Sequence, residues 1–516
     1  METPVVIVGG GPVGLTAALL LARFGVPSVV CEAAAERDPV GSRSICTQRD
    51  VLDILHRVGC GQQLAAEGVT WTHGRTYHRD VELFRITFPA GGEAGFPPFV
   101  NIPQARVESV LEAAVAAEPL IGLRYGTAVT GLAQDRDGVV VSTVAGELRA
   151  THVIGADGCH SVVREALGLP FEGESFADRF LIADIRAELP FGPQRRFHFD
   201  PVWNPGRQVL LHPQPDSVWR IDWQVPAGFD LAEARASGEV DARIRRITGE
   251  TPYEIVWLSA YRFAQRTAAS YVEGRVLLAG DAAHVMTPFG ARGLNSGIAD
   301  AENAAWKIAF DRLGWAGPAL LGSYHDERHA AAVENLRVTG RTMRFLVPPD
   351  EAAMARRREV LARAADDPAA RAEVDSGKLY EPYWYLDSPL TTAWEVHGFP
   401  TEPGLTRPVV PGVLCPDALM PGGRLRERFG PGFTLIGTDR VPPAVDTPVP
   451  VVRLRLDDAE PLGPRPGRVW VVRPDGHLAA VLDDADSESL GAAIRRARGF
   501  QGSPGGSLRA ATGSHP

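Results

Sequence analysis

The chain has 516 residues, of which 45% are hydrophobic and 22% are charged, the balance of an ordinary globular protein. At roughly 100–200 residues per domain, this length predicts about three domains. The 53 Lys and Arg residues are outnumbered by 63 Asp and Glu residues. The resulting net charge of −10 disfavours a nucleic-acid partner, whose phosphates require a basic surface.

Cysteine usage and the N-terminus disfavour further classes. The five cysteines are scattered and none belongs to a C-x-x-C pair, which argues against a disulfide scaffold, a structural zinc site and dithiol chemistry. The first apolar segment lacks the basic residues that precede a signal peptide core, and the apolar stretch 15–22 is far too short to cross a bilayer. We therefore expect a cytoplasmic protein without a membrane segment.

The N-terminal part of the chain predicts an α/β unit. A β-branched run at 5–8, a glycine loop, a helical segment at 15–23 and an apolar run at 28–31 form a strand–loop–helix–strand pattern. Further helices are expected at 49–58 and 106–117, and further strands at 138–144 and 153–156.

From about residue 176 the pattern changes to short alternating strands separated by Pro, Gly and Asn turns. This texture predicts an antiparallel sheet inserted into the α/β frame. Its strands are expected at 195–199, 208–212 and 217–225, after which the frame resumes with a strand at 275–279 and helices at 295–313, 324–345 and 352–365. A Pro/Gly-rich linker around 397–425 precedes strands at 433–437, 468–472 and 477–481, and the tail from 499 has a composition typical of disorder.

The loop after the first strand fits the G-x-G-x-x-G dinucleotide-binding pattern. It contains, in order, Gly9, Gly11, Pro12, Val13 and Gly14. The first glycine permits a tight turn, the second lets the backbone approach a pyrophosphate, and the third lets the helix pack on the strand. The helix start then offers unpaired N–H groups to phosphate. Glu32, at the end of the second strand, is placed to accept hydrogen bonds from an adenosine ribose, so the pattern predicts dinucleotide binding and leaves NAD and FAD open.

Two later segments identify the cofactor. The segment 155–164 (G-A-D-G-C-H-S-V-V-R) follows a strand and opens a helix, while 275–284 (R-V-L-L-A-G-D-A-A-H) and 288–297 (P-F-G-A-R-G-L-N-S-G) precede a long helix. With G-x-G-x-x-G, they resemble the DG and GD motifs of the group A FAD-dependent aromatic hydroxylases, which share the p-hydroxybenzoate hydroxylase fold. The resemblance covers roughly residues 1–345.

The resemblance implies an α/β fold: a Rossmann-like FAD-binding domain with an inserted antiparallel-sheet substrate domain, and a thioredoxin-like α/β domain at the C-terminus. The implied boundaries are 1–175 and 268–395 for the FAD-binding domain with its helical linker, 176–267 for the substrate sheet, 396–500 for the thioredoxin-like domain and 501–516 for a disordered tail. The C-terminal assignment depends on two segments, R-L-R-E-R-F-G-P-G-F and V-V-R-P-D-G-H. Because Cys415 is the only cysteine there, we expect a structural or dimer-supporting role.

The resemblance also implies which residues bind FAD. Asp281 would hold the ribitol hydroxyls, Asp157 with Arg164 would brace the FAD and NAD(P)H side, and Pro288 would lie beside the isoalloxazine. The other implied contacts are Arg43 near the pyrophosphate, Gln104 at a helix start, Val129 at the adenosine, and Gly290, Gly293, Leu294 and Asn295 in the second loop and helix start. For Asp281 and Asp157 the alternative role is helix N-capping.

Elementary electrostatics supports the second loop as a flavin site, because N–H groups at a helix start stabilise negative charge on reduced flavin. One pair of residues departs from the family pattern: Ala291-Arg292 stands where Gln is usual within the loop. Arg292 either supplies a cation to the flavin or to an acidic substrate, or it points at solvent or a carboxylate. We favour the second interpretation.

The family chemistry implies a flavin-dependent monooxygenase. NADPH or NADH reduces bound FAD, O2 forms an FAD C4a-hydroperoxide, and its distal oxygen hydroxylates a small aromatic substrate of phenolic or polyketide type. No metal is required, because the flavin carries the oxygen chemistry. The protein must exclude water and help to deprotonate a phenol, for which a general base is useful.

Candidate bases lie on the expected sheet, and the sequence identifies a partner for none of them. They are His198, His212, Asp222 and Tyr261, with Pro288 and Arg292 as further candidates near the flavin. The commoner role of such residues is that of an ordinary strand or loop residue. The aromatic residues Trp203, Trp219, Trp223 and Phe263 either line a substrate pocket or belong to the core.

Other functions are compatible with the same scaffold. A flavin halogenase needs an active-site lysine, but Lys307 and Lys378 are the only lysines, and Lys307 falls in the helix after the second loop. A Baeyer–Villiger or oxidative ring-opening monooxygenase is the main alternative. A flavin-binding interaction protein without oxygenase activity is the alternative of another class. The family often forms dimers, so a homodimer is the assembly that the resemblance allows.

Overall fold

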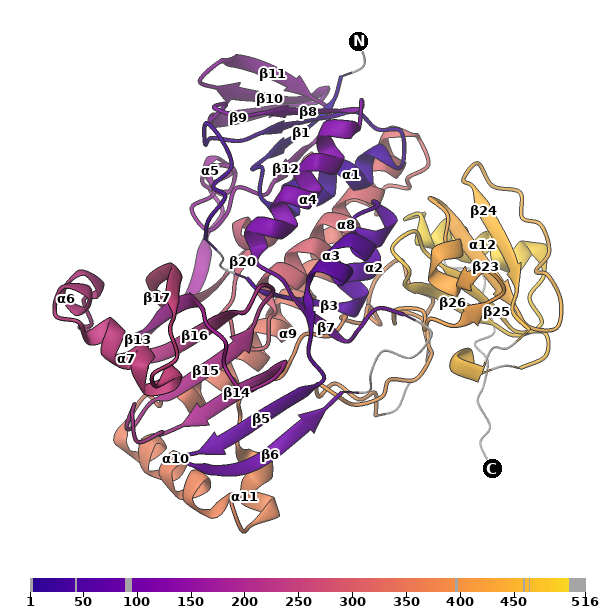
Figure 1. Cartoon of the computed structure of the whole chain (residues 1–516). Coiled ribbons are helices and arrows are strands. Elements are labelled where there is room, and N and C mark those ends of the chain that lie inside the picture. Colours follow the sequence, from indigo (N-terminus) through magenta and orange to yellow (C-terminus); the bar gives the residue numbers. More distant parts are fainter. Residues whose placement is uncertain are drawn as a thin grey trace.

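The computed structural model describes residues 3–41, 44–88, 95–394, 398–457, 460–463 and 465–500. The predicted FAD contact Arg43 and the predicted disordered tail 501–516 lie outside these residues. Figure 1 shows an α/β part at the top, a large sheet below it, and a C-terminal unit (residues 398–500) at the side.

A six-stranded sheet forms the core of the α/β part, in the order β18-β19-β12-β1-β2-β8. Its strands are β1 (Val5–Val8), β2 (Ser28–Cys31), β8 (Ile121–Arg124), β12 (Val153–Gly155), β18 (Val272–Glu273) and β19 (Val276–Leu278). All neighbours run parallel except β18 and β19. The apolar residues of β1 are all buried, as expected of a parallel strand covered on both faces. The predicted Rossmann-like βαβ opening is confirmed.

Helices and two small sheets surround this core. The helices are α1 (Pro12–Ala22), α2 (Arg49–Arg57), α3 (Gly61–Glu67), α4 (Gln104–Ala117), α5 (Val162–Ala166) and α8 (Gly293–Arg312). The antiparallel sheets are β9 (Val129–Asp135), β10 (Gly138–Thr143) and β11 (Gly146–Ala150), and β3 (Cys46–Gln48), β4 (Val69–Thr70) and β7 (Phe99–Asn101). In Figure 1, α1, α4 and α8 lie together beside the core sheet, and β9–β11 lie on its other side.

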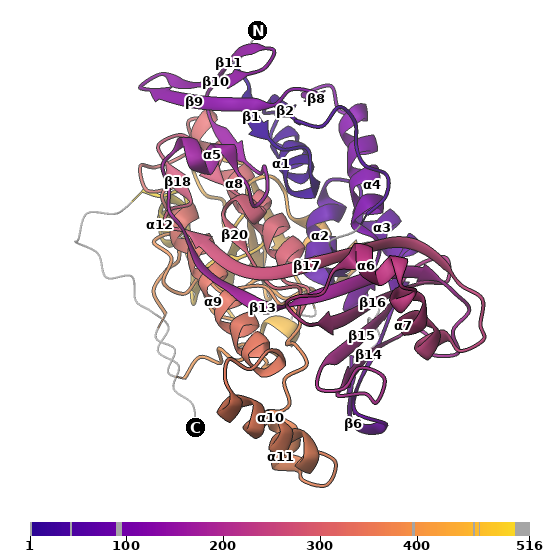
Figure 2. The ribbon, with the colours of Figure 1, turned by 90° about the vertical axis from the view of Figure 1, so that its left-hand side faces the viewer.

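The predicted inserted sheet is confirmed, and it is larger than predicted. Its eight strands have the order β20-β17-β13-β16-β15-β14-β5-β6. They are β5 (His73–His78), β6 (Val81–Thr87), β13 (Phe171–Arg186), β14 (Gln194–Phe199), β15 (Gln208–Pro213), β16 (Val218–Val225), β17 (Glu254–Ala268) and β20 (His284–Val285). Two strands from before the insertion, β5 and β6, join its edge, and the β14–β5 pair is parallel while the others are antiparallel. Figure 2 shows the long strands β13 and β17 running from the α/β part into this sheet.

The two faces of this sheet differ in composition. Alternate residues of β16, including Trp219 and Trp223, pack in a core with the residues of α6 (Leu231–Ala236) and α7 (Glu239–Thr248). The intervening polar residues of β16, among them Asp222, occupy the opposite face, because successive side chains of a strand alternate. Of the two roles considered for Trp219 and Trp223, the core role holds, and Trp203 packs at the edge of the same core. Phe263 instead packs against Phe180 and Phe289 on the other face.

The remaining helices and the C-terminal unit complete the molecule. The helices are α9 (Ser323–Leu346), α10 (Glu351–Arg363) and α11 (Pro368–Glu373). The C-terminal unit contains β21 (Leu419–Met420), β22 (Gly423–Arg424), β23 (Phe433–Gly437), β24 (Val451–Arg455), β25 (Val469–Val472), β26 (Leu478–Leu482) and α12 (Ser487–Ala497). Its four-stranded sheet has the order β24-β23-β25-β26, with only β23 and β24 parallel. This mixed sheet is compatible with the predicted thioredoxin-like unit, and the predicted domain boundaries stay predictions.

Two further observations concern the whole described chain. Cys415 is buried and unpaired, and burial raises the pKa of its thiol to about 12, so it has no thiolate character at neutral pH. No described helix combines the length and apolar composition that a membrane crossing needs.

Candidate cofactor and substrate site

The three glycines that define the G-x-G-x-x-G pattern of the first loop meet different surroundings. A Cβ atom on Gly9, whose φ is +106°, would lie 2.4 Å from the Ala156 carbonyl oxygen, and one on Gly14 would lie 2.0 Å from the Gly9 carbonyl oxygen. The fold therefore requires glycine at both positions. A Cβ atom on Gly11 would meet no described atom within 4 Å. Open space in front of Gly11 is what a closely approaching ligand needs.

Glu32 lies at the edge of the same loop. The Gly10 N–H donates to Glu32 Oε2 at 2.7 Å, and the Ala34 N–H donates to Oε1 at 2.9 Å. These bonds fix the carboxylate beside the start of α1, where the ribose prediction requires it.

The second loop meets the first at the start of α1. A Cβ atom on Gly280 would lie 3.0 Å from Val13 Cγ2, and one on Gly297 would lie 2.7 Å from it, so the 280 turn, α1 and α8 converge at Val13. Neither α1 nor α8 has a capping side chain among the described residues, and neither carries an acidic residue in its first turn. The first N–H groups and the positive dipole ends of two helices are thus available to a ligand. This arrangement fits the pyrophosphate and the anionic ring edge of FAD.

The structure places the other predicted FAD contacts as follows. Asp281 is half-buried in the 3₁₀ turn η1 (Gly280–Ala282). In the second loop, the Pro288 carbonyl accepts a hydrogen bond from the Ala291 N–H, and Gly290 adopts a φ of +96° close to the Lys378 carbonyl. Gly293 and Leu294 form the first turn of α8. Gln104 begins α4 and accepts a hydrogen bond from the Ser44 N–H, and Val129 begins β9. Direct contact of these residues with FAD stays a prediction.

Asp157 and Arg164 have separate roles. Asp157 accepts hydrogen bonds from the Ser161 hydroxyl at 2.6 Å and from the Val163 N–H at 3.2 Å, so it supports the start of α5, whose N-cap residue is Ser161. Burial raises the pKa of Asp157 above its ordinary value. Arg164 donates to the carbonyls of Cys159 at 3.0 Å and Ala282 at 2.9 Å, so its guanidinium connects the DG and GD segments.

The favoured prediction for Arg292 is wrong. Its side chain is buried away from solvent, and its hydrogen bonds within the described part of the chain go to neutral acceptors: it donates to the carbonyls of Lys378 at 3.1 Å and Leu379 at 3.0 Å and to Asn335 Oδ1 at 2.5 Å. The Glu381 carboxylate acts on it electrostatically without a hydrogen bond among these. Burial lowers the pKa of Arg292 to about 10, so the guanidinium stays charged at neutral pH. The segment after α11 folds over the loop and encloses it, a contact between residues more than 80 positions apart.

Asn295 uses its side chain inside the protein. Its Oδ1 accepts from the Gln48 N–H at 2.9 Å, and its Nδ2 donates to the carbonyls of Cys46 at 3.0 Å and Ala291 at 2.6 Å. Asn295 therefore joins β3 to the second loop, and only its backbone is available to a cofactor.

Two candidate bases lie on the sheet face that turns toward Phe289 of the second loop. Asp222 and His212 keep part of their surface exposed although they are enclosed by protein. Burial raises the pKa of Asp222 to about 7, with a further contribution from Asp184. Burial, with the charges of Arg195 and Arg220, holds the pKa of His212 well below its ordinary value. Near neutral pH, Asp222 therefore changes charge while His212 stays neutral.

The other candidates differ in position. Tyr261 pairs with Phe180 and lies 6.2 Å, between ring centroids, from Trp257 on the face of Asp222. His198 lies on the opposite face, stacked on Tyr77, and burial lowers its pKa to about 4. His198 is thus separated from the site by the sheet itself.

Sequence reasoning missed Arg195. Its buried guanidinium donates to the Ser376 carbonyl and interacts electrostatically with Cys46 of β3 and with Asp222. Burial lowers the pKa of Arg195 to about 10, so it keeps its charge at neutral pH. The sequence does contain one indication of this position. Arg195, Phe197 and Phe199 are alternate residues of β14, so the Arg195 side chain lies on the same inward face of the strand as the two phenylalanines.

Replacing Gly11 with Ala tests the cofactor loop. We expect the variant to fold, because its φ of −73° suits any residue and the new methyl group meets open space. We expect its FAD dissociation constant to rise at least about tenfold, because the methyl group takes the place that the ligand needs. Fluorescence titration of the apoprotein with FAD measures this. Gly131→Ala in β9 is the matched control, with equally open surroundings away from the loop, and an equal loss of affinity there would contradict the assignment.

The comparisons with known proteins agree with this geometry. The profile of a family described as "FAD binding domain" matches residues 2–339. The chain is 36% identical to a dialkyldecalin synthase of Streptomyces rugosporus over 64% of this chain and 70% of that protein. It is 34% identical to a 12-dehydrotetracycline 5-monooxygenase/anhydrotetracycline 6-monooxygenase of Streptomyces rimosus, over 68% of this chain and 71% of that protein. The crystal structure of the flavin-dependent monooxygenase PieE with FAD and substrate superposes with a TM-score of 0.84 at 25% identity, over 97% of this chain and 99% of that one.

Proposed function

Because the chain belongs to the FAD-binding domain family of flavin-dependent monooxygenases, we propose that it hydroxylates an aromatic or polyketide-type substrate held against the sheet face of Asp222. It is an FAD-dependent enzyme that uses a reduced nicotinamide and O2. The observation that carries the proposal is the convergence at Val13 of two helix starts that have no described capping side chain, with Asp222, whose pKa is about 7, on the sheet face that turns toward the second loop.

In this proposal the two loops bind FAD and the sheet binds the substrate. Gly11 and the start of α1 would hold the pyrophosphate, Glu32 the ribose and Asp281 the ribitol, while the first turn of α8 would face the ring. When bound, FAD supplies the hydride acceptance and the oxygen activation. Packing of Phe289 against Phe180 and Phe263 provides an apolar, water-poor boundary between the second loop and the sheet.

Asp222 is the general base of the proposal. A carboxylate with a pKa of about 7 is poised to take the proton of a phenolic or enolic hydroxyl at neutral pH. The Arg195 guanidinium interacts with Asp222, and it would stabilise the negative charge that the substrate oxygen gains. Neutral His212 would offer a hydrogen bond without adding charge.

The test is a product analysis with purified, FAD-loaded protein. We expect NADPH or NADH consumption to accelerate when phenols or polyketide-type aromatics are added, and the product to gain one oxygen atom as a hydroxyl. A protein that cannot take up FAD would refute the proposal. An ester or ring-opened product would favour the Baeyer–Villiger alternative, and a chloride-dependent halogenated product would favour a halogenase. Lys307 argues against a halogenase, because it is fully buried and 2.8 Å from the Glu327 carboxylate.

The dialkyldecalin synthase among the relatives supports a second candidate function. In this candidate the chain closes rings of a substrate held at the same sheet face, with bound flavin in a supporting role. The same experiment separates the two: a ring-forming enzyme gives a product isomeric with its substrate and consumes no NADPH or NADH.

A further inference from the structure

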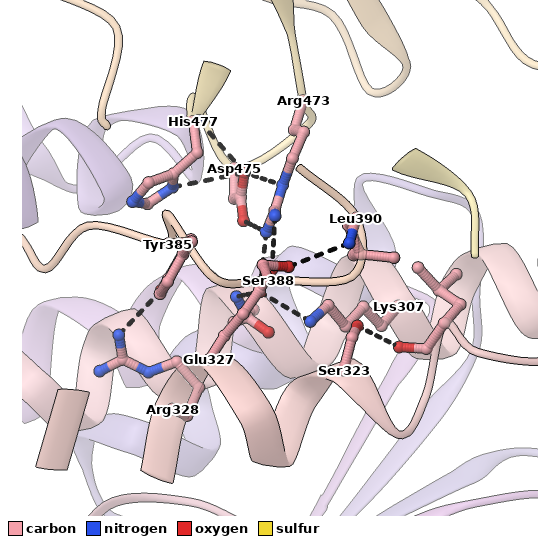
Figure 3. A network of polar contacts seen from close by, with 12 residues as sticks. Lys307, Ser323, Glu327, Arg328, Tyr385, Ser388, Leu390, Arg473, Asp475 and His477 are labelled. Carbon is pink, nitrogen blue, oxygen red and sulfur yellow. Dashed lines mark hydrogen bonds and ion pairs between the residues drawn. The ribbon is translucent and has the colours of Figure 1, made fainter. Parts of the chain in front are cut away.

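The C-terminal unit is fixed to the FAD-binding part by buried, mutually compensating charges. Figure 3 shows Arg473 and Asp475 of this unit against Glu327 of α9 and Lys307 of α8. Arg473 donates to Glu327 Oε1 at 2.5 Å and Oε2 at 2.9 Å, and Lys307 Nζ donates to Oε2 at 2.8 Å. All four side chains are buried. The unit is thus held in one place relative to α8, the helix whose start faces the flavin site.

A second connection starts at Arg426, in the 3₁₀ turn η2 (Leu425–Arg428) of the C-terminal unit. Within its own unit, Arg426 donates from Nε to the Cys415 carbonyl at 2.9 Å. From Nη1 it donates to the carboxylate of Asp50 and, at 2.9 Å, to Asp53 Oδ2, both on α2. Burial acts to raise the pKa of Asp50, but the charge of Arg426 outweighs burial and holds this pKa below its ordinary value. Asp50 is therefore a carboxylate over the whole neutral range.

This ion pair continues into the flavin site through Gln48 and Asn295. Asp50 accepts from Gln48 Nε2 at 2.7 Å, and Gln48 Oε1 accepts from the Asp50 N–H at 2.7 Å, so the two side chains fix each other. The Gln48 N–H donates to Asn295 Oδ1 at 2.9 Å, and Asn295 Nδ2 donates to the Ala291 carbonyl at 2.6 Å. An unbroken series of hydrogen bonds thus joins Arg426 to the loop that precedes α8.

The end of this series is a backbone conformation that needs support. Ala291 has a φ of +54°, in the left-handed region that a residue with a Cβ atom rarely adopts. Such a conformation persists only where its surroundings hold it. The hydrogen bond from Asn295 is one of those restraints, and Asn295 is in turn oriented by Gln48.

We propose that Arg426 is a positioning residue, through which the C-terminal unit fixes Gln48, Asn295 and the Ala291 turn and so shapes the flavin-facing start of α8. The inference rests on the proposed function only in placing FAD at α8. It gives the C-terminal unit a part in flavin binding without any contact between that unit and the cofactor.

The test compares Arg426→Gln with Arg426→Lys and with Arg468→Gln. Arg468 pairs with Asp483 at 2.7 and 3.1 Å inside the C-terminal unit, so its replacement removes a similar ion pair without touching α2. A cavity of about 30 Å³ beside Asp50 and Arg426 has room for water to solvate the shorter glutamine side chain. Four quantities are measured for each holoenzyme: the flavin absorption spectrum, the FAD dissociation constant, amide hydrogen exchange at 46–50 and 291–296, and Tm.

For Arg426→Gln we expect an altered flavin spectrum, faster exchange in both segments, and an FAD dissociation constant raised about tenfold, the factor that one lost hydrogen bond produces. Arg426→Lys keeps the charge and should restore most of the spectrum. An unchanged spectrum and affinity in Arg426→Gln, with a Tm decrease no different from that of Arg468→Gln, would overturn the inference. If Arg426→Gln yields no soluble protein, Asp50→Asn interrupts the same series one step later and is judged by the same measurements. If the wild-type protein itself binds no FAD, the proposed function fails instead.

Discussion

Replacing Glu327 with Gln is expected to lower the free energy of unfolding by about 3–5 kcal/mol, the cost of leaving buried charges uncompensated. The Glu327 carboxylate is fully buried between Arg473 and Lys307, and it also accepts hydrogen bonds from Ser388 and Asn303. The glutamine keeps the shape but removes the negative charge. Asp475 then remains as the counter-charge that interacts with both buried cations (Figure 3). Urea unfolding followed by circular dichroism measures the change.

Glu254→Gln is the matched control, because Glu254 forms an exposed ion pair with Arg186 at 2.7 Å. Exposed pairs contribute about 0–1 kcal/mol, so the control should unfold nearly as the wild type does.

The dependence of stability on acid pH provides a second test. The pKa of Glu327 lies below its ordinary value of 4.5: burial acts to raise it, but the Arg473 and Lys307 charges outweigh burial. Its contribution to stability is therefore complete above about pH 4.5 and is lost as the pH falls through the folded-state pKa. A stability difference that is equal in the two variants, or that grows in acid, would contradict the compensated network.

The parts of the fold that the sequence predicted are those set by local rules. The first loop follows from glycine spacing alone: the structure leaves no room for a Cβ atom at Gly9 or Gly14 and leaves space at Gly11. The strand β16 carries equally local information. Trp219 and Trp223 lie on one face of the strand and Asp222 lies on the other. The alternation of side chains along a strand therefore separates the core tryptophans from the candidate site carboxylate.

The residues that were misjudged or missed depend on partners far away in the chain. Arg292 was expected at solvent or a carboxylate, yet it is enclosed by carbonyls of residues 378 and 379. Asp300 was not considered, although it accepts from the Gly280 N–H at 3.0 Å and so holds the second loop. Arg328 in turn donates to Asp300 at 2.6 Å from α9. Neither residue carries a motif. Asp300 reaches the Gly280 turn because α8 packs against η1, and Arg328 reaches Asp300 because α9 packs on α8.

Replacing Asp222 with Asn is expected to lower substrate-dependent turnover by about 100-fold to 10,000-fold, the contribution of a general base. The pH dependence identifies the role more sharply than the rate does. Because Asp222 acts as a base only when ionised and its pKa is about 7, wild-type turnover should rise with pH through about 7 and then level off. The turnover of the variant should not show this rise with pH. Its FAD affinity should stay unchanged, because Asp222 lies on the sheet and not on the cofactor loops.

The stability of the same variant separates a chemical effect from unfolding. The folded-state pKa of Asp222 lies above its ordinary value of 3.8, so ionising it in the folded protein costs stability that grows as the pH rises from 3.8 to about 7. Above pH 7, Asp222→Asn should therefore be at least as stable as the wild type, and its loss of turnover cannot arise from unfolding. Asp241→Asn, an exposed change on α7 behind the sheet, is the control and should leave both the rate and the pH profile unaltered. If turnover of Asp222→Asn still rises with pH through about 7, the proton transfer belongs to another group. Tyr261 on the same face would then be the next residue to replace.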